Sequence, residues 1–258
     1  MKTQFLKVGL VAALSCATVA FAQNPFAGTW KADYAKSHVT GDTITFTPEA
    51  SGRVRVTADA RSYSFKPDGS DTTNTMGETE QWTKSDNNNW KTVTEVGPET
   101  VTDIWEVSDN GKTLTDSSSG TMPNGQPFNE TEAFARIAPG KGLYGEWRST
   151  KMSHNSPNTI QIEAKGDNGI IWNIPAIKAS VELNFDGKET AHTGPTVPQG
   201  LMLAATKTGS HSFKLVEKMK GKLLWTGHFT VSPDGKTLTE SGRAVGASTS
   251  EKVVYQKV

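Results

Sequence analysis

The side chains best suited to metal or acid–base chemistry are five histidines: His38, His154, His192, His211 and His228. No two of them have the spacing of a helical zinc motif such as H-E-x-x-H, so we expect no metal ion and no cofactor. His38 and His154 occupy equivalent places after two copies of one short motif, described below. We take both as candidate ligand-binding residues; the competing interpretation is a loop residue that both copies inherited.

Acid–base catalysis needs a pair of positioned ionisable groups. Four carboxylates lie in segments with strand-like patterning: Glu78, Glu80, Asp103 and Glu106. In sequence alone, they do not differ from the solvated face of a strand. The chain also lacks the Gly-x-Ser-x-Gly motif of a serine nucleophile. The sequence therefore favours a protein that is not an enzyme and leaves acid–base catalysis as an alternative.

Tryptophan is the more informative residue type, because the chain contains seven. Trp82, Trp90 and Trp172 lie in segments that read as strands. In a small β-barrel, inward aromatic side chains either fill the core or line the pocket of one small ligand. We retain these three residues as candidate ligand contacts, with core packing as the alternative.

The chain that positions these residues repeats itself. The sequence FAGTWK at residues 26–31 returns 117 positions later as LYGEWR, with Gly and Trp in the same places. Three segments recur in one order, which a chance match would not preserve: 26–31 as 143–148, 108–115 as 232–239, and 134–137 as 255–258. The sequence therefore predicts two related units.

Both units have the pattern of short strands. Apolar and polar residues alternate at 43–47 and 53–57, which is the period of a half-buried strand. Pro67-Asp68-Gly69 and Asn110-Gly111 are turn signals, since they supply the backbone angles that tight turns need. Strands separated by turns every 8 to 12 residues or so indicate a sandwich or a barrel. No amphipathic helix is expected.

The Gly-x-Trp strand that opens each unit, with a basic residue on the unit's last strand, resembles the lipocalin or calycin pattern. The chain is also similar to exported bacterial lipocalin-like proteins. The resemblance implies an all-β fold of two tandem antiparallel up-and-down β-barrels with eight strands each. It further implies a barrel closure in which a cation stacks on the tryptophan, pairing Trp30 with Arg136 and Trp147 with Lys257.

The N-terminus has the pattern of a secretory signal peptide over residues 1–22. Lys2 and Lys7 precede an uncharged apolar run, and Ala20-Phe21-Ala22 forms a cleavage motif. The run is shorter than the roughly 20 apolar residues that a membrane-spanning helix needs. We therefore expect export to the periplasm or the medium and no transmembrane span after cleavage.

Two barrels are then expected at 23–138 and 143–258, joined by a Pro/Gly-rich linker at 138–142. Cys16 is the only cysteine, and lipid attachment there is an alternative fate of the leader. That alternative lacks the leucine usually found three positions earlier. Cleavage after Ala22 would leave no cysteine, so each barrel would depend on its own apolar core rather than on a disulfide.

The chain contains 27 basic and 27 acidic residues, and this balance gives no support for nucleic acid as a partner. Our leading hypothesis is an exported, non-enzymatic binding protein for a small, mostly apolar ligand. One alternative is an isomerase or hydratase that acts on an apolar substrate in a barrel pocket. Another is a structural or interaction module of the cell envelope.

Overall fold

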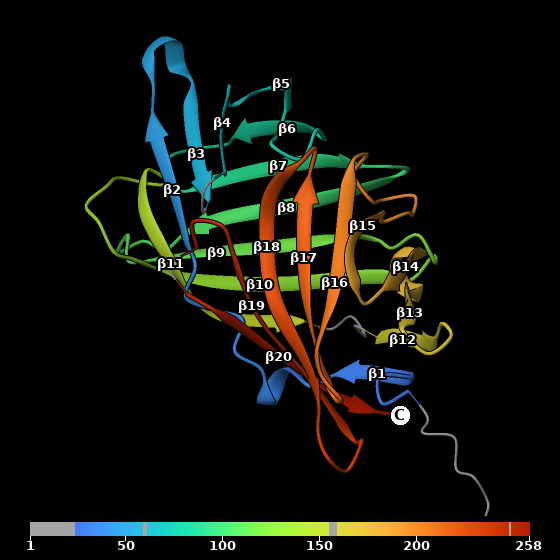
Figure 1. Cartoon of the computed structure of the whole chain (residues 1–258). Coiled ribbons are helices and arrows are strands. Elements are labelled where there is room, and N and C mark those ends of the chain that lie inside the picture. Colours follow the sequence, from blue (N-terminus) through green and yellow to red (C-terminus); the bar gives the residue numbers. More distant parts are fainter. Residues whose placement is uncertain (1–23, 59–60, 155–158, 248) are drawn as a thin grey trace, which may run out of the picture.

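The protein is all-β in a computed structural model that describes residues 24–58, 61–154, 159–247 and 249–258 (Figure 1). These residues contain no α-helix. They form three 3-10 turns: η1 (Tyr34–Lys36), η2 (Ala50–Gly52) and η3 (Pro175–Ile177). The expected signal peptide and Cys16 lie outside the described residues. Two antiparallel, barrel-like sheets of ten strands each confirm the expected tandem all-β architecture.

The first barrel has the strand order β4-β3-β2-β11-β10-β9-β8-β7-β6-β5. Neighbours in the sheet are mostly neighbours in the chain, as an up-and-down arrangement requires. The bounds are β2 (Thr43–Pro48), β3 (Val54–Ala58), β4 (Arg61–Phe65), β5 (Asp68–Thr73), β6 (Thr79–Lys84), β7 (Asn89–Val96), β8 (Glu99–Val107), β9 (Thr113–Thr121), β10 (Pro127–Arg136) and β11 (Gly145–His154).

The second barrel has the order β14-β13-β12-β1-β20-β19-β18-β17-β16-β15. Its bounds are β1 (Gly28–Ala32), β12 (Thr159–Ala164), β13 (Gly169–Ile174), β14 (Ala179–Asn184), β15 (Asp186–Ala191), β16 (Leu201–Gly209), β17 (Ser212–Met219), β18 (Lys222–Val231), β19 (Thr237–Ala244) and β20 (Glu251–Lys257). Hydrogen bonds between Ser180 and Thr193, with N–O distances of 2.8 and 3.0 Å, draw its two edges together.

Each sheet has ten strands. The eight strands per barrel that the lipocalin resemblance implied are therefore wrong. The extra strands arise where the chain turns a corner at the open edge of each sheet. Two residues separate β4 from β5, and Phe185 alone separates β14 from β15. Gly69 and Gly187 follow these corners with φ of 83° and 77°, a backbone region that glycine enters without a Cβ clash. The expected Pro67-Asp68-Gly69 turn therefore lies at the corner between β4 and β5, the two edge strands of the first sheet.

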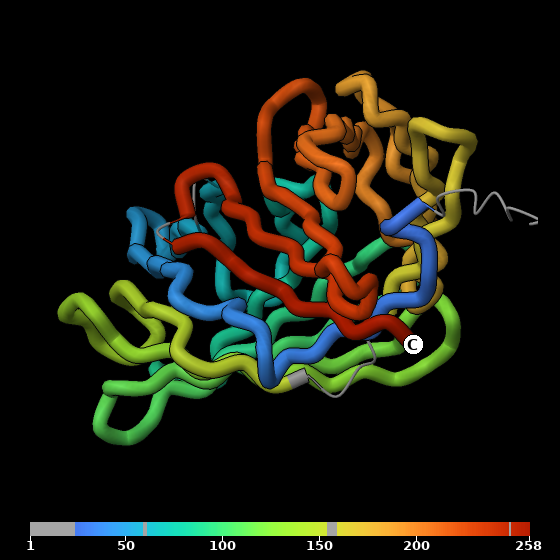
Figure 2. The backbone as a smooth tube through the Cα atoms, turned by 60° about the horizontal axis from the view of Figure 1, so that its bottom comes forward, coloured from blue at the N-terminus to red at the C-terminus, as the bar shows by residue number. Residues whose placement is uncertain are grey.

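The two barrels exchange their Gly-x-Trp strands. β1, from the first unit of sequence, lies between β12 and β20, and β11, from the second, lies between β2 and β10. Figure 2 shows blue β1 running beside dark red β20. The ranges 23–138 and 143–258 therefore do not coincide with the two sheets.

Local geometry explains the exchange. β10 ends at Arg136 and β11 begins at Gly145, so a short connection joins them, and they pair antiparallel as a hairpin. This hairpin places β11 at the seam of the first barrel, beside β2. The corresponding seam of the second barrel is left for β1, which pairs Trp30 with Ile160 on one side and Lys257 on the other.

Each barrel has its own apolar core, built from the inward residues of alternating strands. The first core contains Phe46, Phe65, Trp82, Trp90, Trp105, Leu114 and Trp147 among its members. The second contains Phe26, Trp30, Ile160, Trp172, Phe213, Phe229 and Leu238 among its members. Trp30 belongs to the second core and Trp147 to the first. Each exchanged strand therefore contributes a core residue to its barrel as well as backbone pairing.

Candidate ligand cavity in the second barrel

The closing cations stack on tryptophans, but the partners are exchanged relative to the lipocalin-based expectation. The Arg136 Cζ lies 3.9 Å from the ring centre of Trp147, and the Lys257 Nζ lies 5.1 Å from that of Trp30. The predicted pairs Trp30 with Arg136 and Trp147 with Lys257 are therefore wrong. Since the Gly-x-Trp strands are exchanged, each tryptophan meets the last strand of the other sequence unit.

Both tryptophans are fully buried and have their polar atoms satisfied. The indole N–H of Trp30 donates to the Phe26 carbonyl at 2.8 Å, and that of Trp147 donates to the Leu143 carbonyl at 2.9 Å. Arg136 also donates to three backbone carbonyl oxygens, those of Gly111, Gly142 and Tyr144. These contacts join first and last strands and satisfy the indole N–H groups of both tryptophans.

Two of the candidate ligand contacts lie in the first core. Trp82 stacks on Phe65 with ring centres 4.3 Å apart, and its indole N–H donates to Glu80 at 2.9 Å. Trp90 is 1% exposed and packs edge-on against Tyr144. The structure therefore places Trp82 and Trp90 in packed aromatic contacts of the first barrel, away from the cavity described next.

The two candidate histidines lie on other segments of the chain than the three candidate tryptophans, which belong to β6, β7 and β13. His38 forms an isolated backbone bridge with Lys252, with both N–O distances 2.7 Å, beside the start of β20. His154 ends β11, where it pairs with Glu130. Its side chain lies outside the described part of the chain.

Trp172 lines a cavity of about 400 Å³ inside the second barrel. Apolar side chains from β12, β13, β16, β17 and β18 form most of the wall. The lining residues are Arg61, Ile160, Trp172, Ile174, His192, Leu203, Leu215, Glu217, Leu224, Trp225, Phe229, Glu240, Ala244, Glu251 and Tyr255. In this cavity a predicted ligand contact, Trp172, meets an apolar wall and several ionisable groups.

Three aromatic rings shape the cavity. Trp172 packs edge-on against Phe229, with ring centres 4.8 Å apart, and Trp225 lies 6.3 Å from Phe229. Two glycines make room for Trp225: a Cβ at Gly227 would lie 2.2 Å from its ring, and one at Gly242 would lie 1.8 Å away. The missing side chains on β18 and β19 therefore let the indole lie directly on the backbone.

Four polar side chains are placed within this apolar wall. Tyr255 donates its hydroxyl to the Glu240 carboxylate at 2.9 Å, across the β19–β20 pair. Glu217 on β17 and Glu251 on β20 line the same cavity. The site therefore combines an aromatic surface with three carboxyl groups and one phenol.

Burial sets the protonation behaviour of these groups. Desolvation raises the pKa of Glu240 to about 7, with smaller contributions from the neighbouring charges of Glu251 and Glu217. Desolvation also raises the pKa of Glu217, and the Arg61 guanidinium partly opposes this shift. The pKa of Tyr255 is raised by burial and by Glu240, so the phenol stays protonated. Glu240 therefore exchanges its proton near neutral pH.

His192 adds a further polar atom at the cavity. Burial lowers the pKa of its imidazole, which favours the neutral ring. Its Nε2 is buried and has no hydrogen-bond partner among the described residues. A buried polar atom left in this way is costly to the fold, so it is available to hydrogen-bond a bound molecule.

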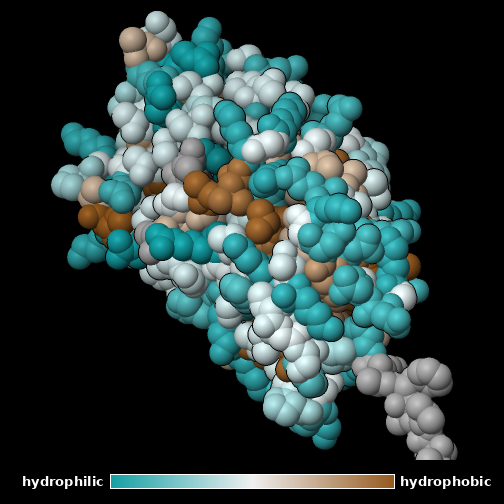
Figure 3. Space-filling model, viewed as in Figure 1, coloured by the Kyte–Doolittle hydropathy of each residue, from teal (hydrophilic) through white to brown (hydrophobic). Residues whose placement is uncertain are grey.

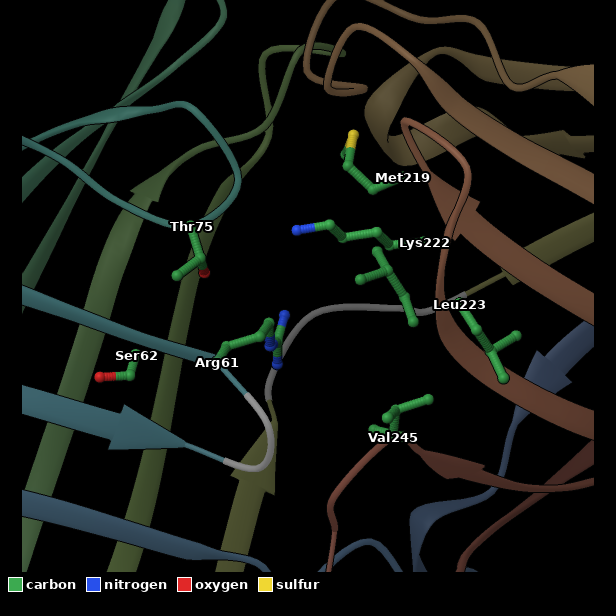
Figure 4. Close-up of a pocket in the computed structure, with 9 residues that line it drawn as sticks. Arg61, Ser62, Thr75, Met219, Lys222, Leu223 and Val245 are labelled. Atoms are coloured by element: carbon green, nitrogen blue, oxygen red, sulfur yellow. The ribbon is translucent and has the colours of Figure 1, made fainter.

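The cavity opens toward the first barrel. A groove of about 400 Å³ between the barrels shares Arg61, Leu224 and Ala244 with the cavity lining. Figure 4 shows the Arg61 side chain extending from β4 into this gap, toward Leu223 and Val245. Both of these apolar residues are exposed, at 44% and 40%, and Figure 3 shows apolar surface gathered near the centre of this face. Leu223 and Val245 therefore give the groove beside the cavity mouth an apolar side, which an apolar molecule could contact.

The equivalent level of the first barrel is built differently. Gly227 pairs with Gly242 in the second barrel, and the matching pair in the first is Asp103 with Ser118. Desolvation raises the pKa of Asp103, and it raises to about 8 the pKa of Asp116, which lies two residues before Ser118 on β9. Polar side chains thus stand in the first barrel where the second has an indole ring lying on glycine.

Sequence reasoning missed Glu217, Glu240 and Tyr255, although one signal was present. The matched segments 108–115 and 232–239 are each followed directly by a carboxylate, Asp116 and Glu240. Alternation from the buried Leu114 and Leu238 points both carboxylates inward. Extending the repeat by one residue would therefore have found a buried acid in each barrel.

Comparison with known proteins finds no matching family model, no matching curated protein and no matching solved structure. Among the described residues, no helix has the length and apolar character to cross a membrane. The same part of the chain contains no group of three histidine, cysteine, aspartate or glutamate side chains placed to hold a metal ion.

Proposed function

We propose that the protein is an exported, lipocalin-like, non-enzymatic binding protein that holds one small, mostly apolar molecule inside the second barrel. The observation that carries this proposal is the cavity of about 400 Å³ lined by Trp172, Trp225 and Phe229. Ligand pockets commonly occupy about 300 to 1,000 Å³, with mostly apolar walls and a few polar groups that orient the ligand. The second barrel has both properties.

The apolar wall of the cavity favours an apolar ligand. Water in such a cavity contacts ring faces and aliphatic side chains, and its displacement releases about 25 cal/mol per Å² of buried apolar surface. The few polar atoms, on Glu217, Glu240 and His192, are suited to orienting one end of the ligand. The N-terminal pattern at 1–22 supports export, where such a carrier would meet its ligand outside the cytoplasm.

A second candidate function is acid–base catalysis on an apolar substrate, as in an isomerase or hydratase. One observation favours it: Glu240 has its pKa raised to about 7 and lies beside the Tyr255 hydroxyl in an apolar cavity. A carboxyl group with such a pKa both accepts and releases a proton near neutral pH. Turnover of a bound molecule, lost in Glu240→Gln with binding retained, would establish this function over simple binding.

Native mass spectrometry of the purified protein, after incubation with an extract of small apolar molecules, tests binding. Leu215→Trp fills the cavity and should abolish adducts. Ile104→Trp adds the same ring on the exposed face of β8 and serves as the matched control. Adducts that survive Leu215→Trp, with both variants folded, would contradict a binding site inside the second barrel.

A further inference from the structure

We propose that the second-barrel cavity selects molecules that carry one positive charge on an apolar body, the chemical class of alkyl- and arylalkylamines. This inference rests on the proposed binding function and names the ligand class. It depends on three features of the cavity: its charge balance, its aromatic rings and the position of its single guanidinium.

The charge balance favours a cation. Glu217 and Glu240 supply two carboxyl groups to the lining, and Arg61 supplies the one guanidinium. His192 is held toward its neutral form by burial. Even with one carboxylate compensated by Arg61, one acid remains in excess, and a bound monocation would balance its charge.

The aromatic rings favour a cation with an apolar body over an inorganic ion. Trp172, Trp225 and Phe229 surround the volume into which the carboxyl groups face. The faces of such rings attract an ammonium group within about 6 Å, and indole does so best. Much of the remaining wall is aliphatic, including Ile160, Leu203 and Leu215, and these side chains provide no oxygen ligands for a hydrated metal ion.

The position of Arg61 argues against an anion such as a fatty acid. Its side chain is exposed and extends from β4 at the mouth, in the gap between the barrels (Figure 4). An anionic headgroup held there would leave the carboxyl groups deeper in the cavity uncompensated. An anion that entered further would face them directly, at an energetic cost that a low dielectric increases.

Protonation links binding to pH. The charged or titratable groups around Glu240 are Glu217 on β17, Glu251 and Tyr255 on β20, Arg61 on β4, His192, and Tyr34 in η1, which acts on Tyr255. A bound cation stabilises the ionised form of Glu240, so binding should release a proton near neutral pH. Affinity should therefore rise from pH 6 to pH 8 and level off above.

Three probes of one shape test the inference: 4-phenylbutylamine, 4-phenylbutanol and 4-phenylbutyrate. Calorimetric titration of the full protein should show the amine binding at least about tenfold more tightly than the alcohol, which corresponds to one strong cation–π or ionic contact. The butyrate should bind most weakly. Heats measured in buffers of different ionisation enthalpy should reveal proton release for the amine alone.

Glu240→Gln should bring the affinity for the amine close to that for the alcohol. Glu217→Gln should also lower the affinity for the amine, and it provides an independent test if Glu240→Gln fails to fold. Asp116→Asn, at the equivalent place in the first barrel, is the matched control and should change neither the affinity for the amine nor that for the alcohol. Equal affinity for amine and alcohol, or tighter binding of the butyrate, would overturn the inference and leave the proposed binding function standing. No binding of any probe would count against both.

Discussion

Replacing Trp30 by alanine should strongly destabilise the second barrel, to which the first sequence unit contributes β1 alone. Trp30 has 0% exposure, donates a hydrogen bond to Phe26 and stacks under Lys257. Truncating a buried aromatic side chain of this size costs about 3–5 kcal/mol. Since a domain is stable by only about 5–15 kcal/mol, Trp30→Ala should remove a large part of the stability of the second barrel.

Hydrogen exchange with mass spectrometry resolves the two sheets. In Trp30→Ala, amides of β12 to β20 should lose protection while those of β2 to β10 keep theirs. Trp147→Ala is the mirrored control, because Trp147 pairs with Ile44 and packs in the first core. It should expose β2 to β10 instead. Loss of protection in β2 to β10 after Trp30→Ala, with β12 to β20 unchanged, would refute the strand exchange.

Two further predictions concern charged groups. Because burial raises the pKa of Glu240 from 4.5 to about 7, the folded state binds an extra proton between these values. Below about pH 4.5 the protonated Glu240 contributes at most about 3 kcal/mol more to the stability of the folded state than the ionised group does at high pH. This contribution is lost as pH rises through 7. Urea unfolding should show Glu240→Gln more stable, relative to wild type, at pH 8 than at pH 5; an equal difference at both values would contradict the assignment. Lys257→Arg should raise the melting temperature of the second barrel slightly, because a guanidinium stacks on indole better than an ammonium does. Arg136→Lys should lower that of the first barrel more, since Arg136 also donates to three backbone carbonyls; a larger effect at Lys257 would contradict this ranking.

Much of the fold follows from local patterns in the sequence. Alternating residues at 43–47 and 53–57 fall in β2 and β3, and the Asn110-Gly111 turn joins β8 to β9. The exchange of β1 and β11 could not be read in this way, because both strands carry the same Gly-x-Trp motif. By its sequence, either strand could pair at the seam of either barrel. The short connection between β10 and β11 decides which strand lies in which barrel.

The candidate site was predicted less completely, because a cavity depends on the sizes of neighbours that are distant in sequence. Trp82, Trp90 and Trp172 look alike in sequence, yet Trp82 and Trp90 pack in the first core and Trp172 lines open volume. The difference arises partly from Gly227 and Gly242, which accommodate Trp225. Such a relation between two strands is invisible until their register is known.

Photo-crosslinking with a small apolar diazirine probe, followed by peptide mapping, tests the central claim most directly. Binding inside the second barrel predicts adducts on cavity residues of β13, β17 and β18, including Trp172, Leu215 and Trp225. These adducts should disappear when an excess of unreactive competitor is added. Competed adducts confined to the first barrel or to the outer surface would contradict the account.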